Sequence, residues 1–351
     1  MLELIIIITL AIVMDLIWGE FPTKIHPVVW MGKVIEGIST PLLWSNSRIS
    51  GLILTIITSA CFILLFYLIL QLATSNFIFY VLIAALVTSS TFAIRELFKT
   101  ASEICDIMGI DLKRTRILVS YLVSRDTTKS SSEDLVSSTV ESVTENINDS
   151  VTAPIFYIIL IGSLTWALFR MFSINSSHMP ILIDFNVFNY LIQFKNPLTT
   201  LVSVATFAII AGVFYRVINT LDAMVGYKNE KYSVIGWFPA RLDDILNYIP
   251  SRVTGLLIVI AALIGGFDWK NSWKIMRRDA RKTPSPNSGF PMAAAAGALN
   301  VRLEKPGVYI LGDPGKSLDQ KIIKKTLYLT KITIVLFLMA GFIILILLGS
   351  R

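Results

Sequence analysis

Long apolar blocks separated by polar segments constrain the fold of this chain more than any other feature. The blocks that are long enough to span a membrane are residues 2–18, 51–72, 77–98, 153–172, 198–218 and 327–348. An α-helix needs about 20 apolar residues to cross a hydrocarbon layer of roughly 30 Å. Charged residues make up 16% of the chain, whereas soluble domains carry about a quarter. We therefore predict an all-α polytopic membrane protein with about six transmembrane helices, in a single membrane domain over residues 1–351.

A further apolar segment, residues 253–267, is short for a full span and decides the topology. If it crosses the membrane, the basic region 270–325 lies on the opposite side from the regions around Arg125 and Arg241. If it is re-entrant or interfacial, all three regions share one side, together with nearly all Lys and Arg residues. Lys and Arg are enriched in cytoplasmic segments, which favours the second arrangement. We therefore expect a multi-pass protein of the cell membrane whose active face is cytoplasmic.

The polar regions between the apolar blocks carry the candidate functional residues; they are 19–50, 99–150, 219–252 and 268–326. The formal net charge of +7 does not indicate nucleic-acid binding, because no basic run is interleaved with aromatic residues. In the first region, His26 is either a base or ligand, or a structural hydrogen-bond donor before Pro27.

The region 99–150 places carboxylates at four-residue intervals, at Glu141, Glu145 and Asp149. On a helix this spacing puts them on one face, where like charges repel, so we expect a cation to offset them. The candidate cations are Mg²⁺, an amine or facing arginines, and the alternative is a solvated acidic face. The same region also holds Arg125, Asp126 and Asn146.

The stretch from Arg216 to Arg252 mixes Arg, Asp, Asn and Trp with glycines and prolines, which a solvated membrane loop does not require. Loops on a rigid scaffold commonly carry binding groups, so we interpret this stretch as a site. At helical spacing Asp243 and Asn247 share one face, as do Arg241 and Asp244. The candidates here are Arg216, Asn219, Asp222, Arg241, Asp243, Asp244, Asn247 and Arg252.

The stretch RRDARKTPSPNSGFPMAAAAGAL, residues 277–299, is too rich in proline for regular structure before Pro291. Pro291 suits the first turn of a helix, and a helix start with arginines upstream predicts an anion site. The alanine run permits close approach of either a large flat ligand or a neighbouring helix. The candidates in this stretch are Arg277, Arg278, Ser285 and Asn287.

Together these segments resemble the cobinamide-phosphate synthase family of cobalamin biosynthesis, the CbiB/CobD family. The matching motifs are HPVVWMG (26–32), RDT (125–127), VESVTENINDSVTAP (140–154), YRVINTLDAMVGYKNE (215–230), GWFPARLDDILNYIPSR (236–252) and RRDARKTPSPNSGFPMAAAAGAL (277–299). The resemblance covers most of the chain outside residues 173–196. One departure is Gly19-Glu20-Phe21-Pro22, where the family usually has Gly-Asp-Pro.

The resemblance implies an amide-forming ligase that joins a carboxyl group of adenosylcobyric acid to (R)-1-amino-2-propanol or its O-phosphate. Amide formation from a free acid in water is uphill, so the resemblance also implies ATP, with Mg²⁺. The corrinoid is then a substrate rather than a bound cofactor, and the later enzymes of nucleotide-loop assembly are expected neighbours in the membrane. ATP must bind without a Walker loop, because Gly312–Ser317 lacks the G-x-x-x-x-G-K-[ST] spacing.

In this chemistry, cations are needed on the phosphates and on developing charge, and a carboxylate near the amine must accept a proton. Mg²⁺ is expected on Glu141, Glu145 and Asp149. The candidates for catalysis are Asp126, Glu145, Asp222, Asp243 and Asp244. The candidates for substrate binding are His26, Arg125, Asn146, Arg216, Asn219, Arg241, Asn247, Arg252, Arg277, Arg278, Ser285 and Asn287.

Two other functions remain open from the sequence. A transporter for a corrinoid or another amphiphile would place ionisable residues near the middle of its spans and often show repeated halves. The spans here are nearly free of charge and show no repeat. A non-catalytic scaffold for other membrane enzymes is the second alternative, and the many Asp, Arg and Asn residues in fixed motifs argue against it.

Overall fold

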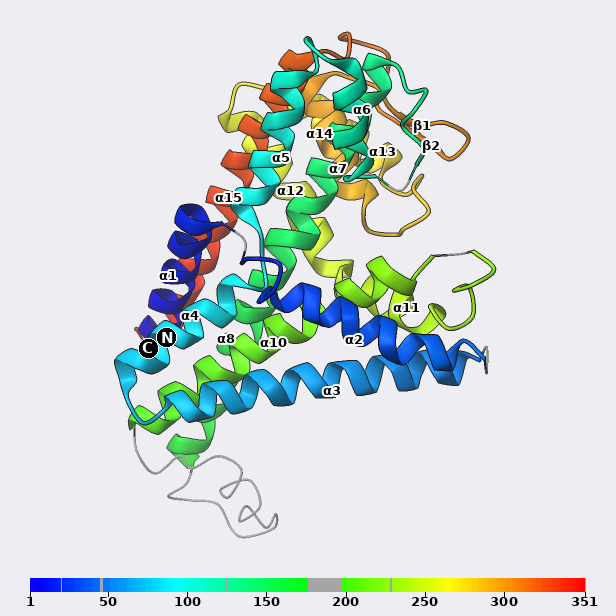
Figure 1. The fold of residues 1–351 in the computed structure, drawn as a ribbon. Helices are drawn as coiled ribbons and strands as arrows, with labels where there is room; N and C mark the ends of the chain where they lie inside the picture. Colours follow the sequence, from blue (N-terminus) through cyan, green and yellow to red (C-terminus); the bar gives the residue numbers. More distant parts are fainter. Residues whose placement is uncertain (20, 45–46, 124, 176–196, 228, 351) are drawn as a thin grey trace. The chain divides into compact units, whose positions relative to one another are not determined.

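The computed structural model describes the chain apart from residues 20, 45–46, 124, 176–196, 228 and 351 (Figure 1). Glu20, in the Gly-Glu-Phe-Pro segment that departs from the family pattern, therefore lies outside the described residues. So does most of the segment 173–196, which the family resemblance does not cover. The chain divides into two compact units, which we call unit 1 (residues 1–92, 154–240 and 340–351) and unit 2 (residues 93–153 and 241–339). Each unit gathers segments that are far apart in the sequence.

Unit 1 is made of apolar helices: α1 (Leu2–Trp18), α2 (Pro27–Leu42), α3 (Arg48–Ala73), α4 (Phe77–Ser89), α8 (Ala153–Asn175) and α10 (Pro197–Val225). Helix α1 packs against α4, and α10 packs against α3 and α2. The buried Tyr80 of α4 and Thr206 of α10 share a hydrogen bond of 2.9 Å between their hydroxyl oxygens. Gly51 allows a close approach, because a Cβ atom there would lie 2.1 Å from the carbonyl oxygen of Ile235.

Unit 2 carries most of the polar motifs. Its elements in chain order are α5 (Ile94–Ile107), α6 (Leu112–Ser120), α7 (Ser132–Ile147), the π-helical turn η1 (Asn148–Thr152), α12 (Tyr248–Ile264), α13 (Trp269–Asp279), α14 (Gly289–Leu299) and the antiparallel strands β1 (Leu303–Lys305) and β2 (Tyr309–Leu311). Two further helices belong partly to each unit, α11 (Trp237–Leu246) and α15 (Gln320–Gly349). A capping box between Ser131 and Asp134 begins α7.

The alanine-rich helix α14 is the centre of unit 2, where it packs against α13, α12 and α7. All of its residues except Phe290 are buried. A Cβ atom at Gly297 would lie 2.5 Å from the carbonyl oxygen of Asn271, so α13 and α14 touch through their backbones. Of the two interpretations of the alanine run, the structure supports a close contact between helices rather than a surface for a flat ligand.

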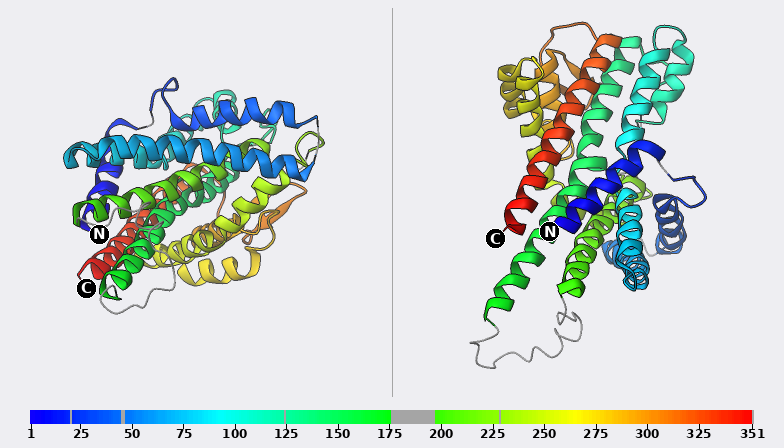
Figure 2. Two further views of the ribbon diagram at one scale, coloured as in Figure 1. Left: turned by 90° about the horizontal axis from the view of Figure 1, so that it is seen from below. Right: turned by 90° about the vertical axis from the view of Figure 1, so that its left-hand side faces the viewer.

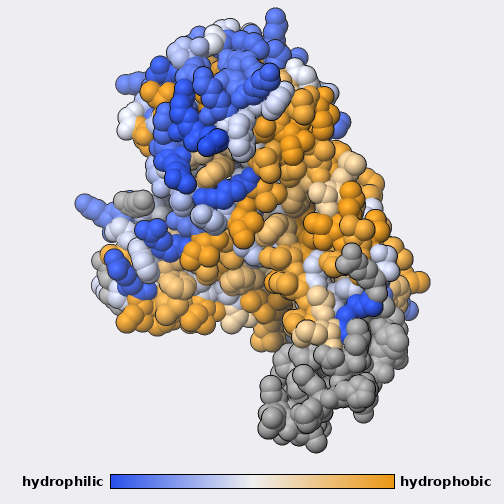
Figure 3. Space-filling model, turned by 180° about the vertical axis from the view of Figure 1, so that it is seen from behind, coloured by the Kyte–Doolittle hydropathy of each residue, from blue (hydrophilic) through white to orange (hydrophobic). Residues whose placement is uncertain are grey.

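Helices long enough to span a membrane are present as predicted, but α1 (Leu2–Trp18), which covers the predicted span 2–18, has 17 residues and is not among them. The stretches of the described chain that are long and apolar enough to cross a membrane are Arg48–Ala73, Phe77–Ile107, Ser132–Met171, Val204–Val225 and Gln320–Gly349. Helices α11 and α12 form a further pair, bent by 46°, which is either one broken span or a re-entrant loop. On the face drawn in Figure 3, hydrophobic side chains form continuous areas and hydrophilic side chains gather at the top of the view.

Three details differ from the predicted boundaries. The block 77–98 is interrupted, because α4 ends at Ser89 and α5 begins at Ile94. In the intervening run of hydroxyl residues, Ser90 and Thr91 donate side-chain hydrogen bonds to the backbone carbonyls three residues earlier, which competes with the helix. The short segment 253–267 belongs to the longer helix α12, and α7 passes into η1 before Asp149, so that carboxylate lies in a π-helical turn.

Candidate active site

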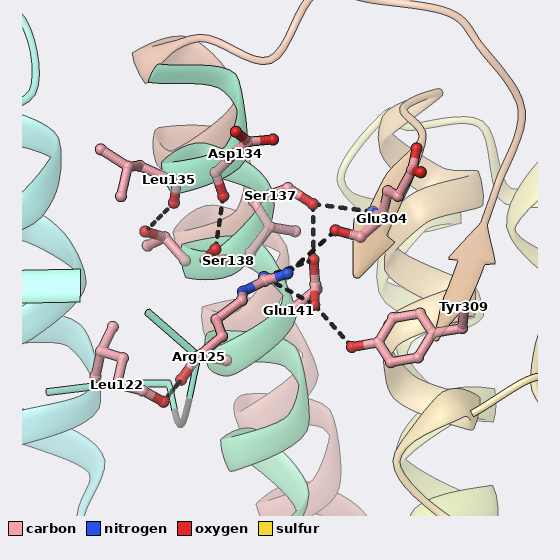
Figure 4. Close-up of polar contacts among 12 residues, drawn as sticks. Leu122, Arg125, Asp134, Leu135, Ser137, Ser138, Glu141, Glu304 and Tyr309 are labelled. Carbon is pink, nitrogen blue, oxygen red and sulfur yellow. Dashed lines mark hydrogen bonds and ion pairs between the residues drawn. The ribbon is translucent and has the colours of Figure 1, made fainter. Parts of the chain in front are cut away.

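A buried ion pair joins α7 to the turn before it (Figure 4). One guanidinium nitrogen of Arg125 lies 3.1 Å from both carboxylate oxygens of Glu141, and a second donates to the carbonyl oxygen of Glu304 in β1. The Glu141 side chain is only 6% exposed. It also accepts hydrogen bonds from the hydroxyl groups of Ser137, at 2.7 Å, and Tyr309, at 2.7 Å. Both carboxylate oxygens are therefore occupied by donors from this chain.

This arrangement answers the question of which cation offsets the carboxylate row of α7. Of the three alternatives, a facing arginine neutralises Glu141. The described residues contain no group of three His, Cys, Asp or Glu side chains that could hold a metal ion. The predicted Mg²⁺ site on Glu141, Glu145 and Asp149 is therefore not found, because Glu141 is engaged and the π-helical turn interrupts the regular four-residue spacing at Asp149.

The pKa of the Tyr309 hydroxyl is affected by the negative charge of Glu141. Burial, followed by the neighbouring carboxylate of Glu141, raises the pKa of the Tyr309 hydroxyl well above its ordinary value. The phenol is thus a stable hydrogen-bond donor to the Glu141 carboxylate at any physiological pH. It fastens the β1–β2 hairpin to α7.

We expect Glu141→Gln to destabilise the protein by about 3 kcal/mol, because it leaves the guanidinium of Arg125 without its buried counter-charge. Thermal unfolding in detergent should show a melting temperature lower by about 4 °C, equally with and without Mg²⁺. Asp126→Asn, at an exposed carboxylate, is the control and should leave the melting temperature unchanged. A melting temperature of Glu141→Gln that equals the wild type in the absence of Mg²⁺, and differs only in its presence, would restore the metal interpretation.

A second cluster connects η1 to the start of α12 through buried amide groups. The side-chain amide of Asn148 donates to the side-chain oxygen of Asn247 at 2.9 Å, and Asn247 in turn donates to a carboxylate oxygen of Asp243 at 2.9 Å. Thr254 of α12 donates to the side-chain oxygen of Asn148 at 3.1 Å. Asn148 and Asn247 are each 2% exposed. The predicted shared face of Asp243 and Asn247 is confirmed, and Asn148 fixes it to a segment about a hundred residues earlier.

A third cluster surrounds Arg252 in the first turns of α12. Its guanidinium lies over the ring of Tyr248, 3.5 Å from the centroid, and over the ring of Phe290, at 4.2 Å. It donates to the side-chain oxygen of Asn287 at 3.1 Å, and Asn287 donates onward to the carbonyl oxygen of Asp244 at 2.8 Å. In the described chain, all hydrogen-bond acceptors of Arg252 are neutral and no carboxylate lies within ion-pair distance. Its positive charge is therefore fixed in position but not neutralised.

Arg278 and Asp279, at the end of α13, form a fourth cluster. The two side chains make a bidentate pair with distances of 2.8 Å. The fully buried carboxylate of Asp279 also binds the ammonium of Lys282, at 2.6 Å, and the backbone N–H of Gly312, at 2.9 Å. Arg278 reaches Asp313 at 2.8 Å. Burial alone would raise the pKa of Asp279, but the hydrogen bonds from Arg278, Lys282 and Gly312 outweigh it and lower that pKa to about 2.

The other predicted residues of unit 2 have smaller roles in the geometry. Asp126 accepts from the backbone N–H of Thr128, which lowers the pKa of its exposed carboxyl group and makes it a turn residue. Asn146 donates to the backbone of Ser142 within its own helix. Ser285 accepts from the backbone N–H of Asn287 at 3.2 Å.

The last two predicted site residues of unit 2 are arginines. Arg241 lies 3.9 Å from Asp244, which confirms that they share a helix face, although the Arg241 side chain is 64% exposed and such a pair is weak. Arg277 is exposed, with its guanidinium over the ring of Trp273.

The remaining predicted residues lie in unit 1. The imidazole Nδ1 of His26 accepts from the backbone N–H of Val28 at 3.1 Å, so His26 is the N-cap of α2. Its role in this contact is structural, but as an acceptor rather than the expected donor. Arg216 donates to the side-chain oxygen of Asn219 at 3.4 Å, one turn along α10. Asp222 lies one turn further along the same helix. Arg216, Asn219 and Asp222 therefore lie together in the last turns of α10, in unit 1.

Sequence reasoning missed three residues that organise unit 2. Asn148 lies inside a motif, and a buried amide in a helix that continues as an apolar span was the available signal. Asp279 follows two arginines that were interpreted as part of an anion site, so the acid beside them was not singled out. Tyr309 gave no signal, because its hydrogen bond to Glu141 joins positions 168 residues apart.

Comparison with known proteins identifies similar chains over most of this length. The family model described as CobD/CbiB protein matches residues 8–179 and 196–338. A protein of Methanothermobacter thermautotrophicus named probable cobalamin biosynthesis protein CobD is 45% identical over 336 residues, covering 95% of this chain and 96% of its own. The cobalamin biosynthesis protein CobD of Dehalococcoides mccartyi is 34% identical, covering 93% of each chain. No solved structure matches the chain.

Proposed function

Because the chain belongs to the CobD/CbiB protein family, which acts in cobalamin biosynthesis, we propose that it is an amide-forming ligase. The reaction joins a carboxyl group of adenosylcobyric acid to (R)-1-amino-2-propanol or its O-phosphate and gives adenosylcobinamide or its phosphate. ATP supplies the free energy by activating the carboxylate, which converts a poor leaving group into a phosphate or nucleotide. The reaction takes place at the cytoplasmic face of the cell membrane, beside the later enzymes of nucleotide-loop assembly.

The observation that supports this activity best is the meeting of three family motifs within unit 2. Asn148 of the first motif is bonded to Asn247 of the second, and Arg252 of the second is bonded to Asn287 of the third. Acidic, basic and amide side chains are thereby held within one network. Amide ligation needs these three kinds of group, for the proton, the phosphates and the amide-fringed corrin respectively.

Within this network, each side chain has a distinct task. The carboxylate of Asp243, held by the amide of Asn247, accepts a proton from the attacking amine. The fixed guanidinium of Arg252 binds a phosphate group. The amide groups of Asn247 and Asn287 hold the carboxylate of Asp243 and the guanidinium of Arg252 in position by hydrogen bonds. Water exclusion follows from burial, since Asn148, Asn247 and Asn287 are each less than 5% exposed.

Magnesium is not given a protein-only site in this proposal. Glu141 does not fit a ligand role, because its oxygens already accept from Arg125, Ser137 and Tyr309. We place Mg²⁺ with the phosphates of ATP, and no step depends on its position in the protein.

The proposal is tested with protein purified in detergent and supplied with adenosylcobyric acid, aminopropanol phosphate and Mg-ATP. Mass spectrometry should detect a corrinoid heavier by the amine less water, formed only when ATP is present. If the corrinoid keeps its mass, and the reconstituted protein instead moves it into vesicles, the protein is a transporter.

We expect Arg252→Lys to raise the KM for the substrate whose phosphate it binds by about 10- to 100-fold, because charged hydrogen bonds contribute about 1.5–3 kcal/mol and lysine loses the fork and the stacking. Steady-state kinetics with aminopropanol and with aminopropanol phosphate show which substrate carries the phosphate that Arg252 binds. A rise confined to aminopropanol phosphate, with free aminopropanol unaffected, assigns Arg252 to the amine. A rise in the KM for ATP with either amine assigns it to the nucleotide, and unchanged constants throughout would contradict a binding role.

A further inference from the structure

Helix α13 has one face fixed to the protein and one face that no described residue covers. Its inner face donates from Ser272 to the carbonyl oxygen of Ala294, at 2.7 Å, and buries Ile275 and Met276. On its outer face, Trp269 and Trp273 lie one turn apart and are 40% and 41% exposed. Large aromatic side chains so exposed require a partner that is apolar on one side and wet on the other.

Basic side chains flank these tryptophans. Lys270 lies over the ring of Trp269, and Arg277 over the ring of Trp273, each 5.8 Å from the centroid. Lys274 is exposed between them. In the described part of the chain, none of these cations is within ion-pair distance of a carboxylate. The adjoining acid, Asp268, caps the helix by accepting from the backbone N–H of Asn271.

The position of α13 in unit 2 identifies what this face meets. It begins five residues after α12 ends, and the last residues of α12, Leu263 and Ile264, are apolar and 57% and 60% exposed. Such a surface at the end of an apolar helix in a membrane protein faces lipid. The start of α13 is therefore continuous with a lipid-facing surface.

A contact between the α12–α13 turn and α15 independently places the start of α13 at the same depth in the membrane. In the turn between α12 and α13, the ring of Phe267 packs on Tyr328 of α15, with centroids 6.1 Å apart. Tyr328 lies at the point where α15 changes character, because its basic residues end at Lys331 and none follows before Gly349. Figure 2, right, shows the yellow α12–α13 segment beside the first turns of the orange-red α15. Tyr and Trp at such a change mark the lipid headgroup level.

We propose that the outer face of α13, made of Trp269, Lys270, Trp273, Lys274 and Arg277, binds the anionic headgroup layer of the lipid bilayer. The indole rings lie among the glycerol groups, and the cations pair with phosphodiester groups of acidic phospholipids. The binding is independent of the reaction, so its test needs no substrate.

The test uses protein reconstituted in bilayers that contain either brominated phosphatidylglycerol or brominated phosphatidylcholine at equal mole fraction. Bromine quenches tryptophan fluorescence on contact. The chain has 7 Trp residues, so the emission of Trp269 and Trp273 is obtained as the difference between the wild type and Trp269→Phe/Trp273→Phe.

For these two tryptophans we expect the anionic lipid to be preferred about fivefold or more, since each surface cation is worth about 1 kcal/mol towards acidic lipid. The triple variant Lys270→Gln/Lys274→Gln/Arg277→Gln should bring the preference close to one, as should salt on the order of 1 M. The matched control Lys113→Gln/Lys129→Gln/Lys316→Gln removes the same charge from exposed positions elsewhere in unit 2 and should keep the preference.

Three results would overturn the proposal. One is the absence of quenching of these two tryptophans by either lipid, which removes the lipid contact. Another is equal quenching by both lipids in the wild type. The last is an equal loss of preference in both triple variants, which would assign the effect to net charge rather than to α13.

Discussion

Replacing Asp243 with asparagine is expected to lower kcat for amide formation by at least about 100-fold, while the KM values change little. The change keeps the shape of the side chain and its contact with Asn247 but removes the group that accepts the proton of the amine. Alkyl amines are protonated at neutral pH, like lysine, so the reaction then lacks its proton acceptor. Steady-state kinetics with mass-spectrometric detection measure this loss.

A second nucleophile separates the proton-accepting role from a structural one. Hydroxylamine is already neutral at pH 7 and needs no base for attack. We therefore expect Asp243→Asn to lose far less activity with hydroxylamine than with aminopropanol phosphate. Asp106→Asn, at an exposed carboxylate of α5, is the matched control and should retain full activity with both. An equal loss with both nucleophiles would mean that Asp243 only holds the structure.

The largest effect on stability is expected at Asp279. Asp279→Ala leaves the cations of Arg278 and Lys282 without their buried partner and the N–H of Gly312 without its acceptor. Breaking such a buried cluster from one side costs about 3–5 kcal/mol. Thermal unfolding in detergent should show the loss at pH 7.

The pH dependence identifies the charge as the cause. The pKa of Asp279 is about 2 in the folded protein, below its ordinary value of 3.8. A carboxyl group with a depressed pKa stabilises the fold above its unfolded-state pKa and loses this contribution as pH falls through the folded-state pKa. The difference in melting temperature between the wild type and Asp279→Asn should therefore be constant from pH 7 to about 5 and shrink towards pH 2. A difference that stays constant below pH 3 would show that packing, not charge, stabilises this cluster.

The sequence predicted the helical membrane architecture well because hydrophobic length is a local property. A bilayer demands about 20 apolar residues whatever the partners of a helix are. The interruption at Ser90 and Thr91 was missed for the opposite reason, because hydroxyl groups are also common inside apolar helices. A long-range hydrogen bond, from the N–H of Ala93 to the carbonyl oxygen of Ser150, lies at the break. The segment 253–267 was expected to be short for a span, but the 46° bend between α11 and α12 was not predicted.

The sequence predicted many residues of the candidate site but few of the contacts that join them. Spacing placed Asp243 and Asn247 on one face, and the structure confirms it. The same reasoning gave Glu141 a magnesium ion, since periodicity shows which residues share a face but not what stands opposite. The opposing group was Arg125, brought back by the turn before α7. His26 was open between a ligand or base and a structural donor, and in the structure it caps α2 as an acceptor.

The most direct test of the central claim is the sidedness of the three polar segments that meet in unit 2. After both native cysteines, Cys61 and Cys105, are replaced by serine, single cysteines at Lys129, Arg241 and Lys316 can be labelled with a membrane-impermeant maleimide in vesicles of known orientation. All three positions should react from the same side, which we expect to be the cytoplasmic one, because hydrogen bonds join their segments within unit 2. Labelling of any one of them from the opposite side would contradict a single active site.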